Sequence, residues 1–342
     1  MGRASTWLSV DVGGDAIGTL SSTGTVNRCQ FLTSAAASVL GARAAIAATA
    51  PQPVVLVTAD TQSHVVVLDL VTGRITGRIP TQRLPRSIET IGSGTALVAH
   101  SELGRLTIVD ARSMDARVLD ARLGEPRYTA LHPARRYAYV TDAKRHEVVV
   151  LDVARERVVA HVAVGGAARH IGIDRAGRLL WTALGAKASD IAVLDLRDPA
   201  RPRLVRTFRP PFLAHDVVFA SDGRRVWVTS GDRGAVAIYD AASERLIRTL
   251  AADGPPQHLA FGGSVAYVTS GDDGTLRTHR LDGTLLRTAR IPVGSYNVSR
   301  ASGVVVSPSL ERGTLCLLDR NGVRRRTVRV APAAHDACVV AG

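Results

Sequence analysis

The sequence is poor in lysine, aromatic residues and cysteine. Of its 43 basic residues only Lys144 and Lys187 are lysine, aromatic residues make up 4%, and the 342 residues include three cysteines. So few cysteines exclude a scaffold built on disulfides. No apolar run reaches about 18 residues without a charge, so we expect no membrane span. The net charge of +13 comes from arginines scattered along the chain, without stacking aromatic residues nearby, so we expect no nucleic-acid partner.

Residues 1–50 show no repeat pattern and are predicted to lie outside the fold. A short basic segment at Arg28 precedes an Ala-rich apolar stretch, as in an export signal. The segment resembles a twin-arginine signal, although Cys29 occupies the place of the second arginine and Arg43 interrupts the apolar stretch. We expect translation to start near Val26 and the protein to be exported to the cell envelope or beyond. The alternative is a disordered or partly helical tail.

Two sequence markers recur in step along residues 51–342. The first is a strand pattern that ends in Val-Thr or a close variant, at positions 58, 99, 141, 182, 229, 269 and 307. The second is an apolar run that ends in Asp, at Asp69, Asp110, Asp152, Asp195, Asp240, Asp282 and Asp319. Seven repeats of about 42 residues indicate an all-β, seven-bladed β-propeller that forms a single domain.

Each repeat reads as four short antiparallel strands separated by turn residues. In the fifth repeat the predicted strands are 215–220, 225–230, 235–240 and 245–250. The chain begins with the second strand of a blade, Val54 to Thr58, and ends with a lone first strand, His335 to Ala341. We therefore expect the C-terminal strand to complete blade 1 and close the ring, because closure removes free sheet edges.

The repeats themselves resemble those of the YVTN family of β-propellers. The matching segments are Ala138-Tyr139-Val140-Thr141-Asp142, Val226-Trp227-Val228-Thr229-Ser230 and Ala266-Tyr267-Val268-Thr269-Ser270. The resemblance covers residues 51–342 and implies a seven-bladed ring in an exported or surface-associated protein. It implies no reaction, since many members have none assigned and similar rings also carry metal or quinone enzymes.

The starts of the seven first strands are predicted to meet at the mouth of the central channel. The residues at this position are Ser87, Tyr128, His170, His215, His258, Asn297 and His335. Four are His, out of ten in the chain. The loops between second and third strands open on the same face and carry Asp60, Glu102, Asp142, Asp232 and Asp272.

Three interpretations of this predicted mouth remain open. His170, His215, His258 and His335 are candidate ligands of a transition metal, with the loop carboxylates as further ligands or supports. Alternatively, protonated histidines together with Arg127 and Arg169 bind an acidic small molecule. In the third, the histidines are structural and bond to loop backbone.

Two of these histidines are followed by Asp, at Asp216 and Asp336. Neighbours in a strand point to opposite faces, so we expect each Asp to turn away from its His and to anchor hydrogen bonds between blades. Cys316 and Cys338 are expected to be small buried residues. The other histidines are expected to be solvated or locally hydrogen-bonded.

The function predicted from these features is binding rather than catalysis. We expect a monomeric module that binds a small molecule or a protein through the channel-mouth face. The alternative is a metal-dependent hydrolase, lyase or oxidoreductase with the four histidines as ligands and Asp232 or Asp272 as the base.

Overall fold

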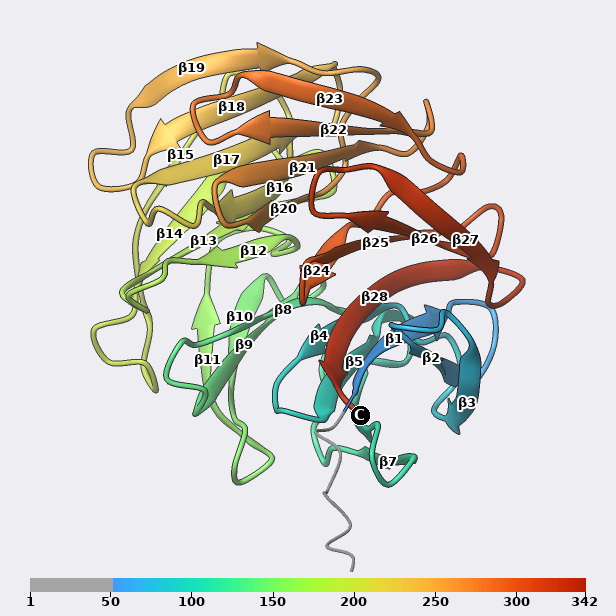
Figure 1. The fold of residues 1–342 in the computed structure, drawn as a ribbon. Helices are drawn as coiled ribbons and strands as arrows, with labels where there is room; N and C mark the ends of the chain where they lie inside the picture. Colours follow the sequence, from blue (N-terminus) through green and yellow to red (C-terminus); the bar gives the residue numbers. More distant parts are fainter. Residues whose placement is uncertain (1–51) are drawn as a thin grey trace, which may run out of the picture. The chain divides into compact units, whose positions relative to one another are not determined.

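A computed structural model describes residues 52–342, which form seven four-stranded antiparallel sheets (Figure 1). The predicted export signal at Arg28 and Cys29, and the proposed start near Val26, lie outside the described residues. Within the described part of the chain, no helix is long and apolar enough to cross a membrane.

We number the sheets as blades 1 to 7 and give the strands of each from the centre outward. Blade 1 has β28 (Ala334–Ala341), β1 (Pro53–Ala59), β2 (His64–Asp69) and β3 (Ile75–Pro80). Blade 2 has β4 (Ser87–Thr90), β5 (Thr95–His100), β6 (Arg105–Asp110) and β7 (Asp115–Val118), with one turn of 3₁₀ helix, η1 (Ser101–Leu103), after β5. Blade 3 has β8 (Pro126–Leu131), β9 (Tyr137–Asp142), β10 (Glu147–Asp152) and β11 (Arg157–Ala163).

The remaining blades repeat this order. Blade 4 has β12 (Ile171–Ile173), β13 (Leu179–Ala183), β14 (Ile191–Asp195) and β15 (Arg203–Phe208). Blade 5 has β16 (Ala214–Phe219), β17 (Arg225–Ser230), β18 (Ala235–Asp240) and β19 (Leu246–Ala251). Blade 6 has β20 (Leu259–Gly262), β21 (Val265–Ser270), β22 (Thr275–Arg280) and β23 (Leu285–Arg290). Blade 7 has β24 (Ser299–Ala301), β25 (Val304–Ser309), β26 (Thr314–Asp319) and β27 (Arg324–Arg329).

The ring closes through the C-terminal strand. Each of the seven innermost strands contacts the innermost strands of both neighbouring blades, and β28 is one of them. In Figure 1, β28 (red) lies beside β1 (blue), and the two strands pair antiparallel from Pro53 opposite Ala341 to Ala59 opposite Ala334. The predicted fold class and the predicted closure are both confirmed.

Burial follows the position of a strand within its blade. The second and third strands are buried on both faces, as in β10 and β17, because each blade packs against a neighbour on either side. The outer strands are largely exposed and carry arginine, as in β27, where Arg324, Arg325 and Arg326 follow one another. Charge on an exposed edge opposes pairing with another sheet. The arginines of the outer strands thus lie where solvent reaches them.

The recurring Thr of the first marker joins blades to one another. Thr141 Oγ1 lies 2.7 Å from the Arg169 carbonyl oxygen of the next blade and 3.2 Å from the Tyr128 carbonyl oxygen of its own blade, and its one hydroxyl hydrogen is shared between them. Thr58 does the same towards Asp336 and Arg86. The hydroxyl satisfies backbone groups where the first strand leaves the regular ladder, which explains why Val-Thr recurs in the sequence.

The recurring Asp of the second marker caps the turn that follows the third strand. Its carboxylate accepts a backbone N–H two or three residues later, as Asp240 does from Ser243 at 2.8 Å. The same bond recurs in the other blades at Asp69, Asp110, Asp152, Asp195, Asp282 and Asp319. Such Asx turns support the connection between the third and fourth strands, together with backbone hydrogen bonds such as that from Glu244 N–H to the Asp240 carbonyl.

Candidate functional site

The predicted mouth residues lie at or next to the beginnings of the innermost strands. Ser87 begins β4, whereas His170 and His258 precede β12 and β20 by one residue. Tyr128 and His215 lie inside β8 and β16, where the strand register shifts between positions 126 and 129 and between 214 and 217. A bulge redirects side chains relative to a regular strand. Because of these bulges, Tyr128 and His215 do not follow the regular alternation of side chains along β8 and β16.

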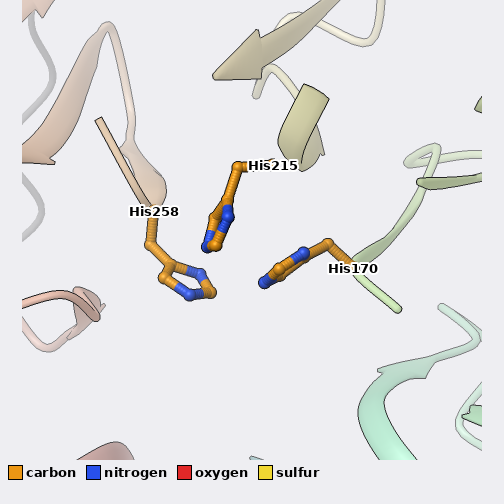
Figure 2. Close-up of side chains that lie close together, drawn as sticks. All are labelled: His170, His215 and His258. Carbon is orange, nitrogen blue, oxygen red and sulfur yellow. The ribbon is translucent and has the colours of Figure 1, made fainter. Parts of the chain in front are cut away.

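Four aromatic rings from blades 3 to 6 gather at the mouth. The ring centroids of His170 and His215 are 4.1 Å apart, and those of His170 and His258 are 4.9 Å apart. His215 and His258 complete the triangle at 5.3 Å. Tyr128 lies against His170 at 4.3 Å. Figure 2 shows the three imidazoles around a common space, with a ring nitrogen of His170 pointing towards the other two rings.

His170 is the most buried member of this cluster. It is 1% exposed, and neither ring nitrogen has a hydrogen-bond partner. Burial, followed by the charges of His215 and His258, lowers the pKa of His170 well below its usual value. The ring is therefore neutral at physiological pH and keeps a lone pair free. A buried polar group without a partner is costly, so this position calls for an explanation.

His215 is oriented by one hydrogen bond to the backbone. Its Nδ1 lies 2.9 Å from the Ala186 carbonyl oxygen, which can only accept, so Nδ1 carries the hydrogen. The lone pair then resides on Nε2. Burial and the neighbouring His258 lower the pKa of His215 to about 3, so the ring is neutral. A backbone carbonyl on one nitrogen is a common way to orient the other towards a metal.

His258 has a carboxylate on one side and a phenol on the other. Its Nδ1 is 3.3 Å from Asp216 Oδ2, and its Nε2 is 3.4 Å from the Tyr128 hydroxyl. Asp216 is itself buried and accepts the backbone N–H of Leu259 at 3.1 Å. A carboxylate behind one imidazole nitrogen fixes the orientation of the ring.

Within residues 52–342, these three imidazoles are the one group of at least three His, Cys, Asp or Glu side chains whose ligand atoms lie close enough together to hold a metal ion. One nitrogen from each of His170, His215 and His258 lies within 4.8 Å of the other two. Zn–N bonds of about 2.0–2.1 Å in a tetrahedral site place ligand nitrogens about 3.3 Å apart. The rings therefore need to turn slightly inward to share an ion. His170 is free to do so, because no hydrogen bond holds its ring.

The remaining predicted mouth residues bond to backbone of another blade. The Ser87 hydroxyl of blade 2 donates to the Arg127 carbonyl of blade 3. The second strand of blade 2 has Ala99 at the position of the Val-Thr marker, so it lacks the recurring hydroxyl. The Asn297 amide donates to the His335 carbonyl at 2.8 Å. His335 Nδ1 lies 3.2 Å from the Arg86 carbonyl, and this histidine is not in the three-nitrogen group. Of the four predicted metal ligands, the structure brings three together.

Asp216 and Asp336 both join adjacent blades, as the strand alternation predicts. Asp336 Oδ2 accepts the N–H of Ile88 at 3.1 Å, and Asp216 accepts that of Leu259. The contact between Asp216 and His258 was not part of the sequence prediction. The sequence contained the information needed to predict this contact. An Asp that points away from His215 must face the first strand of the following blade, and that strand starts next to His258.

The loop carboxylates lie on the mouth face but belong to loop hydrogen bonds. Asp232 accepts the Ser230 hydroxyl at 2.7 Å, and Asp272 accepts the Tyr296 hydroxyl at 3.1 Å. Asp60 lies 3.7 Å from Arg86, and the buried Asp142 accepts the Glu125 N–H at 2.8 Å. None of these carboxylates is in the three-nitrogen group. The expectation that Asp232 or Asp272 is a catalytic base therefore gains no support from their positions.

Behind the mouth, the central channel holds a cavity of about 350 Å³. Its wall includes Tyr128, His258 and Asp336 near the mouth and Glu89 further along β4. Burial raises the pKa of Asp336 to about 6, even though Ile88 donates to it. Glu89 is exposed to the channel, which the seven innermost strands surround. This confinement, and then the charge of Asp336, raises the pKa of Glu89.

Two of the other buried histidines are locally bonded, as expected, whereas Nε2 of the half-buried His64 has no hydrogen-bond partner. His100 contacts the Arg83 carbonyl and the Thr107 hydroxyl, and His279 contacts the Gly283 carbonyl. Cys316 and Cys338 are buried and unpaired, which agrees with their predicted role as small core residues.

Comparison with known proteins shows the fold. No protein-family model matches the chain, and no curated protein is similar enough to match. The solved structures that match include one titled hydrazine synthase from Kuenenia stuttgartiensis, with a TM-score of 0.69 and 16% identity over 79% of this chain and 96% of that one.

Two further structures match to a similar extent. A functionally unknown protein from Desulfotomaculum acetoxidans has a TM-score of 0.71 and 13% identity, covering 84% of this chain and 98% of that one. A protein from Lactobacillus plantarum has a TM-score of 0.70 and 13% identity, covering 85% and 99%. At these identities the likeness concerns architecture alone. The chain is a seven-bladed β-propeller that resembles other propellers of this size.

Proposed function

We propose that this propeller is a binding module whose channel mouth holds a divalent transition-metal ion on His170, His215 and His258. Neutral imidazole suits zinc, copper, iron and nickel. Three nitrogens from three adjacent blades meet there, and each can present a lone pair. The ring supplies the rigidity that such a site requires, because each histidine is fixed at the beginning of an innermost strand.

One observation carries this proposal: His170 is buried with both ring nitrogens unpartnered. A structural histidine is expected to use at least one nitrogen in a hydrogen bond, as His335 does. A ligand that accepts a lone pair from His170 removes the cost of leaving it unpaired. The adjacent nitrogens of His215 and His258 make a cation the ligand that fits.

The number of ligands favours a second candidate function, a metal-dependent enzyme. Structural zinc sites commonly have four protein ligands, whereas catalytic sites have three and leave a position for water or substrate. The three-nitrogen group matches the second pattern. A metal held in this way would lower the pKa of a bound water or polarise a substrate oxygen.

Metal analysis of purified protein tests the proposed site. Apo protein is incubated with one equivalent of zinc, desalted, and measured by elemental analysis. We expect about one zinc per wild-type chain and none in the triple variant His170→Ala, His215→Ala, His258→Ala. The matched control replaces His64, His146 and His161, which lie outside the cluster, and should still bind about one zinc. Equal zinc in both triple variants would refute the site.

We also propose that the protein is exported, on the basis of the basic segment at Arg28 and the apolar stretch that follows it. The test is N-terminal sequencing of the native protein from the cell envelope and medium. Retention of Met1, or a purely cytoplasmic location, contradicts this proposal without affecting the metal site.

A further inference from the structure

Three arginines form an arc directly next to the histidine cluster. Arg86, Arg127 and Arg169 each precede the mouth residue of blades 2, 3 and 4. The equivalent residues of the other four blades carry no positive charge: Ala214, Gln257, Tyr296 and Ala334. At this position of the blades, positive charge is thus confined to one side of the mouth.

The backbone of this arc is held in place by the blades before it. The carbonyls of the three arginines accept hydrogen bonds from Thr58, Ser87 and Thr141 respectively. Such anchoring matters for ligand recognition, because an arginine whose backbone is already fixed loses less conformational entropy when it binds a ligand.

The guanidinium groups differ in their partners. Arg86 pairs with Asp60 at 3.7 Å, and Arg127 pairs with Glu125. Within residues 52–342, no ion pair is formed by Arg169. The Nε atoms of Arg127 and Arg169 are both buried without a hydrogen-bond partner. Two buried charge-assisted donors in adjacent blades therefore lack an acceptor, which is costly unless an anion supplies it.

Arg127 and Arg169 lie at the starts of adjacent innermost strands, because the Thr141 hydroxyl contacts both the Tyr128 carbonyl and the Arg169 carbonyl. Burial, and then the like charge of Arg169, lower the pKa of Arg127. Burial and then a set of neighbouring charges that includes both arginines lower the pKa of His170. The positive field of the arc thus extends over the ring cluster.

We propose that Arg127 and Arg169 form a subsite for a small oxyanion, a carboxylate or a phosphate, that binds beside the histidine cluster. The inference rests on the proposed function, because the anion is proposed to bind next to the metal ion that the three histidines hold. Arginine matches both oxyanions through paired N–H donors in a plane. The Nε hydrogens of the two residues would each donate to an anion oxygen.

Isothermal titration calorimetry with sodium acetate and with inorganic phosphate tests the subsite. Each anion is titrated into zinc-loaded protein and into protein treated with a chelator, at low ionic strength. The variant is Arg169→Gln, which leaves the Arg127 pair with Glu125 in place. The matched control is Arg157→Gln, which removes the same charge from the exposed outer strand β11.

We expect one anion per chain, with affinity reduced about 10-fold or more by Arg169→Gln and unchanged by Arg157→Gln. The two anions separate the classes, since tighter binding of acetate indicates a carboxylate ligand and tighter binding of phosphate a phosphorylated one. Equal binding by both variants, or no binding of either anion to wild type, overturns the inference.

The two proposals fail separately. If wild type binds no zinc but the chelated protein binds an anion that depends on Arg169, the metal proposal falls and the subsite stands. If zinc binds and neither anion does, the subsite falls and the metal proposal stands.

Discussion

The two sides of the channel mouth use the same position of the fold in different ways. On blades 7, 1 and 2, Asn297, His335 and Ser87 bond to the backbone of another blade. On blades 3 to 6, Tyr128, His170, His215 and His258 contact one another. Of these four, His215 also bonds to the Ala186 carbonyl of blade 4, whereas His170 makes no hydrogen bond. We call the first set the latching arc and the second the ring arc.

This difference shows which polar residues the ring needs for its own stability. The latching arc is centred on blade 1, where β28 pairs with β1, and its side chains satisfy carbonyls between blades. The ring arc leaves lone pairs unused in a buried place, which the fold alone does not require. The partners of each side chain thus divide a repeated position into one set that bonds between blades and one set that we propose binds a ligand.

The largest expected effect comes from removing the strand that closes the latching arc. Deleting residues 334–342 removes β28, the innermost strand of blade 1, together with the bonds of His335 and Asp336. The lost packing should exceed the roughly 5–15 kcal/mol that stabilises a typical domain. We expect no cooperative melting by circular dichroism, while deletion of Gly342 alone serves as the control. A truncated chain that melts within a few degrees of wild type contradicts ring closure as the source of stability.

Asp336 and Asp216 provide a matched pair, one on each arc. Each carboxylate accepts a backbone N–H of the next blade, but only Asp216 lies against a ring-arc histidine, 3.3 Å from His258. Replacing either by Ala leaves a backbone N–H unpaired and should lower stability by about 1–3 kcal/mol. Asp216→Ala should in addition weaken zinc binding about 10–100-fold.

Urea unfolding and zinc titration of both variants measure the two effects. The comparison between the arcs is supported if stability falls similarly in both while zinc affinity falls in Asp216→Ala alone. Equal loss of zinc affinity in the two variants would mean that Asp216 supports the ring and not the ligand.

His335 gives the latching arc a dependence on pH. Burial, followed by the charge of Arg86, lowers the pKa of His335 well below the usual 6.5. Below pH 6.5 the unfolded chain takes up a proton that the folded chain does not, so stability falls as the pH falls. This group alone should lower stability by about 1.4 kcal/mol per pH unit, or about 2 kcal/mol between pH 6.5 and 5.

The variant His335→Asn isolates this contribution, because Asn can still donate to the Arg86 carbonyl. Urea unfolding with a chelator at pH 7.5 and pH 5.0 gives the free energies. We expect the wild type to lose about 2 kcal/mol more than the variant over this interval. Equal losses would mean that His335 is protonated in the folded ring as easily as in the unfolded chain.

The fold was predictable because its signals repeat. The Val-Thr marker and the Asp marker recur in every blade or nearly so, and each has one physical role, seen in Thr141 and Asp240. The meeting of strand starts at the mouth follows from ring closure. Blade 2 has Ala99 in place of the recurring Thr, and Ser87 on its first strand supplies the hydroxyl that bonds to the next blade. Both residues can be read from the sequence.

The division of the mouth into two arcs was not predictable in the same way. His170 and His335 occupy equivalent positions with the same side chain, yet only His335 finds a carbonyl within reach. The outcome depends on where a loop of another blade places its backbone, as Ala186 does for His215. Sequence periodicity identifies which residues share a level of the ring, but not which of them the loops satisfy.

The sharpest test of the two arcs compares two substitutions that we expect to change the stability of the protein by a small amount in opposite directions. Asn297→Leu removes a buried hydrogen bond to the His335 carbonyl and should lower stability by about 1 kcal/mol. His170→Leu removes two unpartnered nitrogens from a buried place and should leave stability unchanged or raise it by about 1 kcal/mol. Both are measured by urea unfolding with a chelator. Zinc at about 100 times its dissociation constant should then add about 2.7 kcal/mol to wild type and to Asn297→Leu, and nothing to His170→Leu. If His170→Leu is the less stable variant without metal, His170 is a structural residue and the ring arc loses its distinction from the latching arc.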